Sequence, residues 1–161
     1  MSKSVKAIEK PKTSDRRVLE EKWGKTVIAT GYTVLPTIVL RYQQRLKLKP
    51  LEINILMHLL SYWWQKENLP HPGKNALALA VGVVPSTVRR CLKRLDEKGY
   101  VKRIPRHTSR RGSRTNEYDF SGLIEALGPL AAEELTEINK RKAQRLRRLA
   151  GKKPGLQVVR L

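Results

Sequence analysis

Residues 74–99 read KNALALAVGVVPSTVRRCLKRLDEKG, and this stretch decides the fold. Its first part, Asn75–Val81, is short and almost wholly apolar, which predicts a helix buried on most sides. Gly82 ends that helix, and Pro85 favours the start of another, because proline at the first helical position already has a helical φ. Gly99 is typical of the end of this second helix. Between them, the apolar positions recur at helical spacing: Val88, Cys91, Leu92 and Leu95.

The other face of the second helix is polar and basic. It carries Ser86, Arg89, Arg90, Lys93 and Arg94. An α-helix fits the major groove of DNA, where arginine pairs with guanine and serine or threonine contacts bases or phosphates. A tight turn at Gly82 lets this helix cross the preceding one steeply, as in a helix-turn-helix.

Two strands are predicted after Gly99, at Tyr100–Ile104 and Asn116–Phe120; in the second, Asn116, Tyr118 and Phe120 alternate with Glu117 and Asp119. The segment between them includes His107–Thr115, HTSRRGSRT, which has three arginines and no acid. We therefore expect a hairpin with a cationic tip.

The pattern before this stretch predicts further helices. Spacing favours a helix over Leu35–Leu46, after an extended segment at Val27–Val34, and another starting at Pro50. Asp15–Lys22 is also compatible with a short helix. The prolines and glycine of Leu69–Gly73 end the Pro50 helix.

The C-terminal third is predicted to hold a short helix from Ser121 to Leu127, an interruption at Gly128–Pro129, and a long helix over Ala131–Ala150. The long helix is acidic at its start and basic at its end, which suits the helix dipole. It has two interpretations: pairing with a second copy in a homodimer, or a basic extension along phosphates.

Over Pro50–Phe120 the sequence resembles the winged helix-turn-helix domains of bacterial, phage and plasmid regulators, including GntR-type and replication-initiator-like proteins. Two positions depart from that pattern: Gly73 replaces a serine, and Val84 replaces the serine that usually caps the recognition helix. The residues that match are Pro72-Gly73, Leu77-Ala78, Val81-Gly82-Val83, Thr87-Val88-Arg89-Arg90, Leu95-Asp96, Gly99-Tyr100-Val101 and Asn116-Glu117-Tyr118.

We therefore expect a mainly α (α+β) fold, a winged helix-turn-helix with flanking N- and C-terminal helices. Residues 1–25 are expected to form a mostly disordered basic arm, and 26–120 the winged domain with its lead-in helix. Residues 121–150 are expected to form the C-terminal helices, and 151–161 a basic tail.

The chain has 161 residues and a formal net charge of +20, which indicates an anionic partner. The single cysteine, Cys91, cannot form an internal disulfide, and its place on the apolar face makes it a core residue. The N-terminus lacks the apolar segment of a signal peptide, and the longest apolar stretch, Ala76–Val84, is too short to span a membrane. These features predict a cytoplasmic, nucleoid-associated protein with no membrane partner.

No catalytic constellation or metal-ligand spacing stands out, so we expect no enzyme activity, cofactor or metal.

The predicted function is sequence-specific binding of double-stranded DNA, as a transcriptional regulator. Three alternatives stay open: a plasmid or phage replication initiator-like protein, a winged-helix protein–protein adaptor, and an RNA or ribosome binder.

The residues predicted to read bases are Ser86, Arg89 and Arg90. Lys74, Thr87, Lys93 and Arg94 are predicted to hold phosphates, and Arg110, Arg111 and Arg114 to lie on the backbone or in the minor groove.

Overall fold

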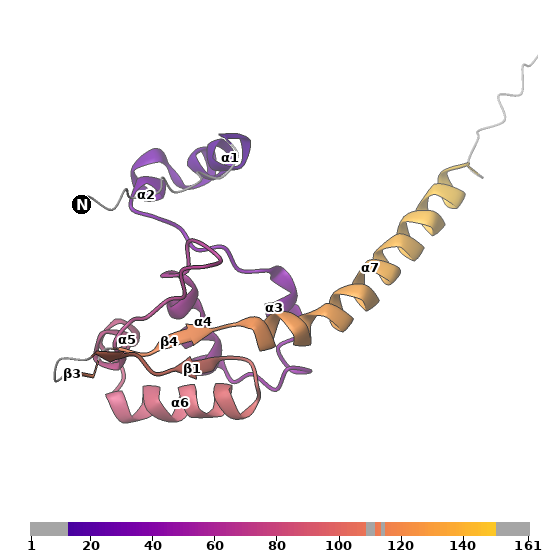
Figure 1. Ribbon diagram of the computed structural model, residues 1–161. Coiled ribbons are helices and arrows are strands. Elements are labelled where there is room, and N and C mark those ends of the chain that lie inside the picture. Colours follow the sequence, from indigo (N-terminus) through magenta and orange to yellow (C-terminus); the bar gives the residue numbers. More distant parts are fainter. Residues whose placement is uncertain (1–12, 109–111, 114, 151–161) are drawn as a thin grey trace, which may run out of the picture.

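The computed structural model describes residues 13–108, 112–113 and 115–150. Most of the described residues are helical, with a small antiparallel sheet, so the predicted fold class is confirmed (Figure 1). The elements in chain order are α1 Thr13–Trp23, α2 Lys25–Ala29, α3 Thr37–Arg41, α4 Pro50–Leu60, α5 Lys74–Val81, α6 Pro85–Glu97, β1 Lys102–Ile104, β2 His107–Thr108, β3 Gly112–Ser113, β4 Glu117–Asp119 and α7 Ser121–Ala150.

The core lies where α4, α5 and α6 meet the sheet and the start of α7. Removal of these apolar side chains from water provides the main driving force for this packing. The side chains with less than 2% exposure include Ile55, Leu56, Leu59, Leu77, Val88, Leu92, Leu95, Tyr118 and Phe120. The helix-turn-helix and the sheet therefore share one core.

A tight turn joins α5 to α6, as predicted. Gly82 has a φ of 74°, in the left-handed region that glycine adopts without strain, and the Val83 N–H donates to the Ala78 carbonyl at 3.0 Å. In Figure 1, α5 is seen close to end-on while α6 runs across the view, so the two helices cross steeply.

The hairpin after α6 is longer than the two predicted strands. β1 pairs with β4 in antiparallel register, with Arg103 opposite Tyr118. Within the segment expected to be only loop, β2 pairs with β3, with His107 opposite Ser113. The backbone ladder thus carries the hairpin further from the core. The Tyr118 N–H also donates to the Pro70 carbonyl at 2.9 Å, which fixes the inner end of the hairpin beside α5.

The N-terminal predictions are confirmed in one part and wrong in another. Residues 13–23 form α1, so the short helix expected at Asp15–Lys22 is confirmed; residues 1–12, the rest of the arm expected to be mostly disordered, lie outside the described residues. Within the predicted extended segment Val27–Val34, α2 runs to Ala29, and the β-branched composition did not prevent a short helix. Burial of Ile28 provides the contact that favours it.

The lead-in helix is shorter than predicted. α3 ends at Arg41, and turns follow as far as Lys47, which has a positive φ of 50°. This reversal lets Leu46 and Leu48 both enter the core at 4% exposure, which a continuous helix over Leu35–Leu46 would not achieve. Core contacts here override the helical spacing.

The predicted break at Gly128–Pro129 is wrong, because α7 is continuous from Ser121 to Ala150. A proline inside a helix removes a hydrogen bond and disfavours the preceding turn. Buried Leu127 and Leu130 flank Pro129 and hold both sides of it against the core. Within the described residues, no helix has the combination of length and apolar character needed to span a membrane.

The prediction that α5 is buried on most sides is also wrong, because one face of this helix is exposed. Leu77 and Ala78 are buried, whereas Leu79 is 85% exposed. The neighbours of α5 are α4 and α6, which cover only one face of this short helix.

Candidate nucleic-acid interface

α6 has one buried and one exposed face, as its sequence predicts. Val88, Cys91, Leu92 and Leu95 each have 0% exposure. The side chains of Ser86, Arg89, Arg90 and Lys93 are exposed, and that of Thr87 is half-buried. The buried face fixes the helix on the domain, so the basic face is presented to solvent as a rigid surface.

The cations on this face have few partners within the protein. The Arg90 Nη2 donates to the Thr87 hydroxyl at 3.3 Å, which orients the guanidinium along the helix. Lys93 Nζ lies 3.6 Å from a Glu97 carboxylate oxygen, but both side chains are exposed and such pairs stabilise little. Among the described residues no acid pairs with Arg89 or Arg90, so both can accept an anionic partner.

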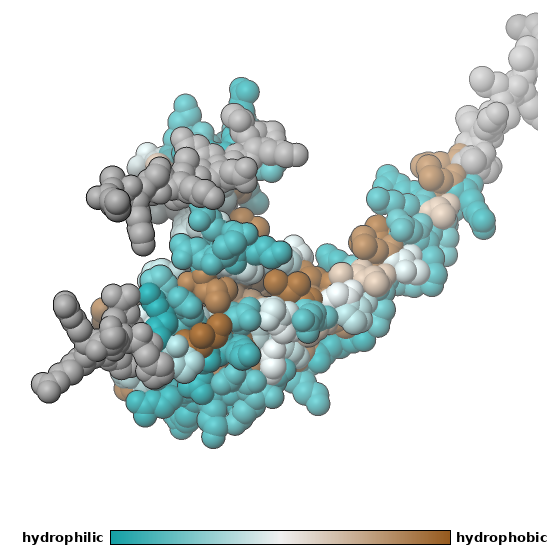
Figure 2. Space-filling model, viewed as in Figure 1, coloured by the Kyte–Doolittle hydropathy of each residue, from teal (hydrophilic) through white to brown (hydrophobic). Residues whose placement is uncertain are grey.

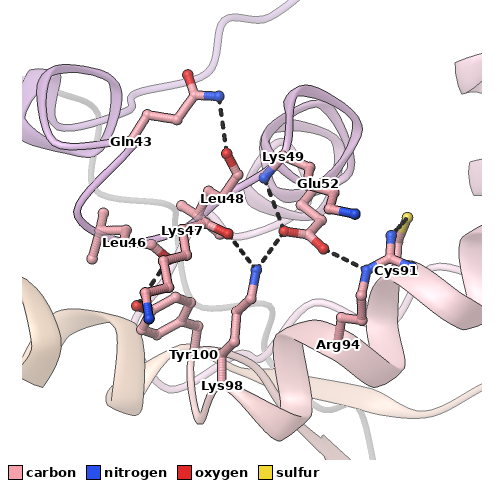
Figure 3. A network of polar contacts seen from close by, with 10 residues as sticks. All are labelled: Gln43, Leu46, Lys47, Leu48, Lys49, Glu52, Cys91, Arg94, Lys98 and Tyr100. Atoms are coloured by element: carbon pink, nitrogen blue, oxygen red, sulfur yellow. Dashed lines mark hydrogen bonds and ion pairs between the residues drawn. The ribbon is translucent and has the colours of Figure 1, made fainter.

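Arg94, predicted to hold a phosphate, points instead into the domain. Its Nε donates to Glu52 on α4 at 2.6 Å, and its Nη2 lies 3.0 Å from the Cys91 sulfur (Figure 3). The guanidinium therefore already has partners that connect α6 to α4.

Glu52 is fully buried at 0% exposure and lies at the centre of this network. It accepts hydrogen bonds from Arg94, from Lys98 Nζ at 2.7 Å and from the Lys49 backbone N–H at 3.0 Å. Burial by itself would raise the pKa of Glu52, but the hydrogen bonds from Lys98, Arg94 and Lys49 outweigh it and lower the pKa to about 2. The carboxylate is therefore ionised at neutral pH and binds two cations, Arg94 on α6 and Lys98 directly after it.

The same network fixes the segment between α3 and α4. Lys98 Nζ also donates to the Lys47 carbonyl at 2.6 Å, and the Tyr100 hydroxyl donates to the Leu46 carbonyl at 3.1 Å (Figure 3). The position of α6 is thus set by polar contacts at its C-terminal half as well as by its apolar face.

Sequence reasoning missed Glu52, although a signal was present. Glu52 shares one helical face with Ile55, Leu56 and Leu59, so its spacing alone placed an acid on a core face. An acid is rarely buried without a partner, which could have pointed to Arg94 and Lys98.

Lys74 lies at the start of α5, beside the base of the hairpin. It lines an open cleft of about 300 Å³ together with Asn75, Thr115 and Asn116. The N-caps of α5 and α6, Gly73 and Val84, make no side-chain cap hydrogen bond. The first backbone N–H groups of both helices therefore lack a side-chain acceptor at the cap, which suits contact with phosphate oxygens.

Ion pairs support the inner part of the hairpin. Arg103 Nε donates to Asp96 at 3.2 Å, and Arg106 pairs with Glu117 at 3.4 Å. The predicted DNA contacts Arg110, Arg111 and Arg114 lie outside the described residues.

The prediction that Cys91 is a core residue is confirmed, since its side chain is buried. Trp63 stacks on Phe120 with ring centroids 5.2 Å apart. Both therefore serve packing of the domain that carries α6.

Comparison with known proteins gives the following matches. Residues 46–101 match the family model described as a helix-turn-helix domain. The N-terminal domain of the DnaD protein from Geobacillus kaustophilus HTA426 is similar over 74% of this chain and 96% of its own, with 20% identity and a TM-score of 0.52. A search of curated proteins gave no match.

Two further structures are similar at lower TM-scores. A MarR/EmrR family transcriptional regulator from Acinetobacter sp. ADP1 is 17% identical over 81% of each chain, with a TM-score of 0.38. A possible transcriptional regulator from Methanosarcina mazei Go1 is 20% identical over 64% of this chain and 80% of its own, with a TM-score of 0.37.

The family match spans α4, α5 and α6, and the hairpin that follows them stands where the wing of such domains stands. This chain therefore carries a winged helix-turn-helix domain.

Proposed function

We propose that this protein is a sequence-specific double-stranded-DNA-binding transcriptional regulator. The observation that carries the proposal is the division of cations on α6. Arg94 and the C-cap residue Lys98 pair with the buried Glu52, whereas Arg89 and Arg90 are exposed with no acid partner among the described residues. A rigid helix with free arginines on its solvent face suits the major groove.

Roles on the DNA follow from position. Ser86, Arg89 and Arg90 lie on the first two turns of the exposed face and are assigned to bases. Lys93, Thr87 and Lys74 flank them and are assigned to phosphates, where they would set the register of the protein. We assign Arg94 to orienting α6, in place of the phosphate contact that its sequence position predicts, because Glu52 already occupies its guanidinium.

The remaining basic residues add affinity. Arg110, Arg111 and Arg114 of the wing are assigned to the DNA backbone or the minor groove. If about six phosphates are neutralised, log K should fall with log salt with a slope of roughly −5. DNA binding of this kind would give the protein a nucleoid location.

The main experiment is selection of bound sequences from a random duplex pool by the full chain, followed by measurement of affinities for the selected site and a scrambled one. Arg90→Ala should reduce the preference for the selected site. Arg111→Ala should weaken both duplexes about equally. If the two variants behave alike, the assignment of base and phosphate contacts is wrong.

The same material tests the other functions that the sequence leaves open. An adaptor that uses its basic face for an acidic protein would show no selected sequence and little retention on duplex DNA at moderate salt. An RNA binder would release duplex DNA when structured RNA competes. A selected palindrome would indicate a homodimer, which we propose to involve Ala131–Ala150.

A further inference from the structure

The N-terminal helices form an apolar cleft that the winged domain does not use. We call this the N-terminal cleft; its volume is about 460 Å³. Trp23, Val27 and Val34 at its border are 60%, 53% and 76% exposed, which is unusual for side chains so apolar and so close together. The apolar side chains that line it include Leu19, Trp23, Val27, Ile28, Val34 and Leu35.

The second half of α7 carries an apolar stripe of its own. We call it the C-terminal stripe: Leu135, Ile138, Leu146 and Leu149, at helical spacing. Leu135, Leu146 and Leu149 are 59%, 67% and 60% exposed. Figure 2 shows apolar residues continuing along this helix where it leaves the domain. The face away from the stripe is basic, with Lys140, Arg147 and Arg148, and Arg145 borders the stripe beside Ile138 and Leu149.

The cleft and the stripe do not meet within one chain. α7 contacts α3 at its start and then projects away from α1 and α2 (Figure 1). Both surfaces lie away from α6, which occupies the opposite side of the domain (Figure 1). A partner could therefore cover them without obstructing the proposed DNA-binding face.

Pairing of the stripe with its own copy is unfavourable. Lys142 lies at its centre, seven residues from both Leu135 and Leu149. Any symmetric pairing centred on the stripe, parallel or antiparallel, would bring two Lys142 side chains together. Two acids near the middle of α7 are engaged within the chain, since Glu134 accepts a hydrogen bond from Tyr42 at 2.6 Å and Glu133 pairs with Arg45 at 2.5 Å.

The N-terminal cleft avoids this repulsion. α1 carries equal numbers of acids and bases, Asp15, Glu20 and Glu21 against Arg16, Arg17 and Lys22. One of its intrahelical pairs, Arg17 with Glu21 at 3.6 Å, is exposed and can exchange partners at little cost. Lys142 would then lie beside a neutral helix that contains glutamates.

We propose that the N-terminal cleft binds the C-terminal stripe of a second copy of this chain, so that a two-fold dimer contains this contact twice. This inference takes the homodimer from the proposed function. It adds which two surfaces of the chain form the dimer contact. A two-fold axis makes the two contacts equivalent, and each copy supplies one cleft and one stripe.

Sedimentation velocity of the full chain provides the test. Trp23→Glu in the cleft and Leu146→Glu in the stripe should each raise the dimer dissociation constant by about 100-fold or more, since each places charge in both contacts. Mixing the two variants should give a heterodimer that is weaker than the parent dimer but tighter than the dimer of either variant alone, because one of its two contacts, between the stripe of the Trp23→Glu chain and the cleft of the Leu146→Glu chain, is intact. Leu79→Glu, an exposed leucine on α5, is the matched control and should leave dimerisation unchanged.

Three outcomes would overturn this dimer: a monomeric parent chain at all concentrations, a Trp23→Glu chain that dimerises normally, or mixed variants that associate no more tightly than each variant alone. Circular dichroism and affinity for single-site duplex DNA show whether each variant remains folded and active. A dimer that selects no DNA sequence would refute the proposed function and leave the dimer intact, so the two failures are distinguishable.

Discussion

Replacing Glu52 by glutamine tests the network that fixes α6. The substitution keeps the shape of the side chain but removes its negative charge, so Arg94 and Lys98 lose their common counter-ion. Because Glu52 is 0% exposed, water cannot replace the lost contacts without opening the interface between α4 and α6.

The expected loss follows from the pKa. Lowering the pKa of Glu52 from 4.5 to about 2 corresponds to about 3 kcal/mol of folding stability at pH 7. The folded pKa is depressed, so this stability is present above pH 4.5 and is lost as the pH falls towards 2. At pH 3 roughly half or less of it should remain.

The assay is chemical denaturation of the parent and Glu52→Gln chains at pH 7 and pH 3. We expect the variant to be less stable by about 3 kcal/mol at pH 7, with a smaller difference at pH 3. Glu125→Gln, at an exposed glutamate on α7, is the control and should change stability by less than about 0.5 kcal/mol. A loss below about 1 kcal/mol at pH 7, or an equal loss at both pH values, would refute the reasoning.

Four further predictions concern two glycines, a proline and salt. Gly122→Ala should destabilise by about 3 kcal/mol or prevent folding, because its Cβ would lie 1.8 Å from the Gly99 carbonyl oxygen; normal stability in denaturant melts would contradict this. Gly128→Ala has open space around its Cβ and should stabilise by about 0.5–1 kcal/mol in the same assay. Pro129→Ala should also stabilise α7, by about 1–3 kcal/mol, since it restores a helical N–H; a lower thermal midpoint would count against the continuous helix. A DNA affinity that does not change between low and high salt would exclude the phosphate contacts.

The helix-turn-helix could be predicted because its signals are local. Gly82, Pro85 and Gly99 act through their own backbone preferences, and the apolar spacing of α6 fixes which face is buried. The pairing of β1 with β4 followed from two short strand-like segments, the second of them alternating, joined by a polar loop. For these elements short-range patterns agree with the tertiary contacts, so the tertiary structure had little to override.

Several elements depended on contacts between distant parts of the chain. α7 continues through Pro129 because buried leucines on both sides hold it to the core. α3 ends early because Leu46 and Leu48 both reach the core. In each case tertiary burial outweighs a local preference worth only a few kcal/mol.

In the candidate site, too, some features follow from local sequence and others depend on tertiary contacts. The sequence by itself determined that α6 has an apolar face and a basic face, because both faces follow from helical spacing. Only the tertiary structure decided which cations of α6 are available, because Glu52 lies 42 residues before Arg94 and meets it only when α4 packs on α6. Arg89 and Arg90 remain exposed for a partner, whereas Arg94 and Lys98 neutralise a buried carboxylate, and that choice is made by burial and distance.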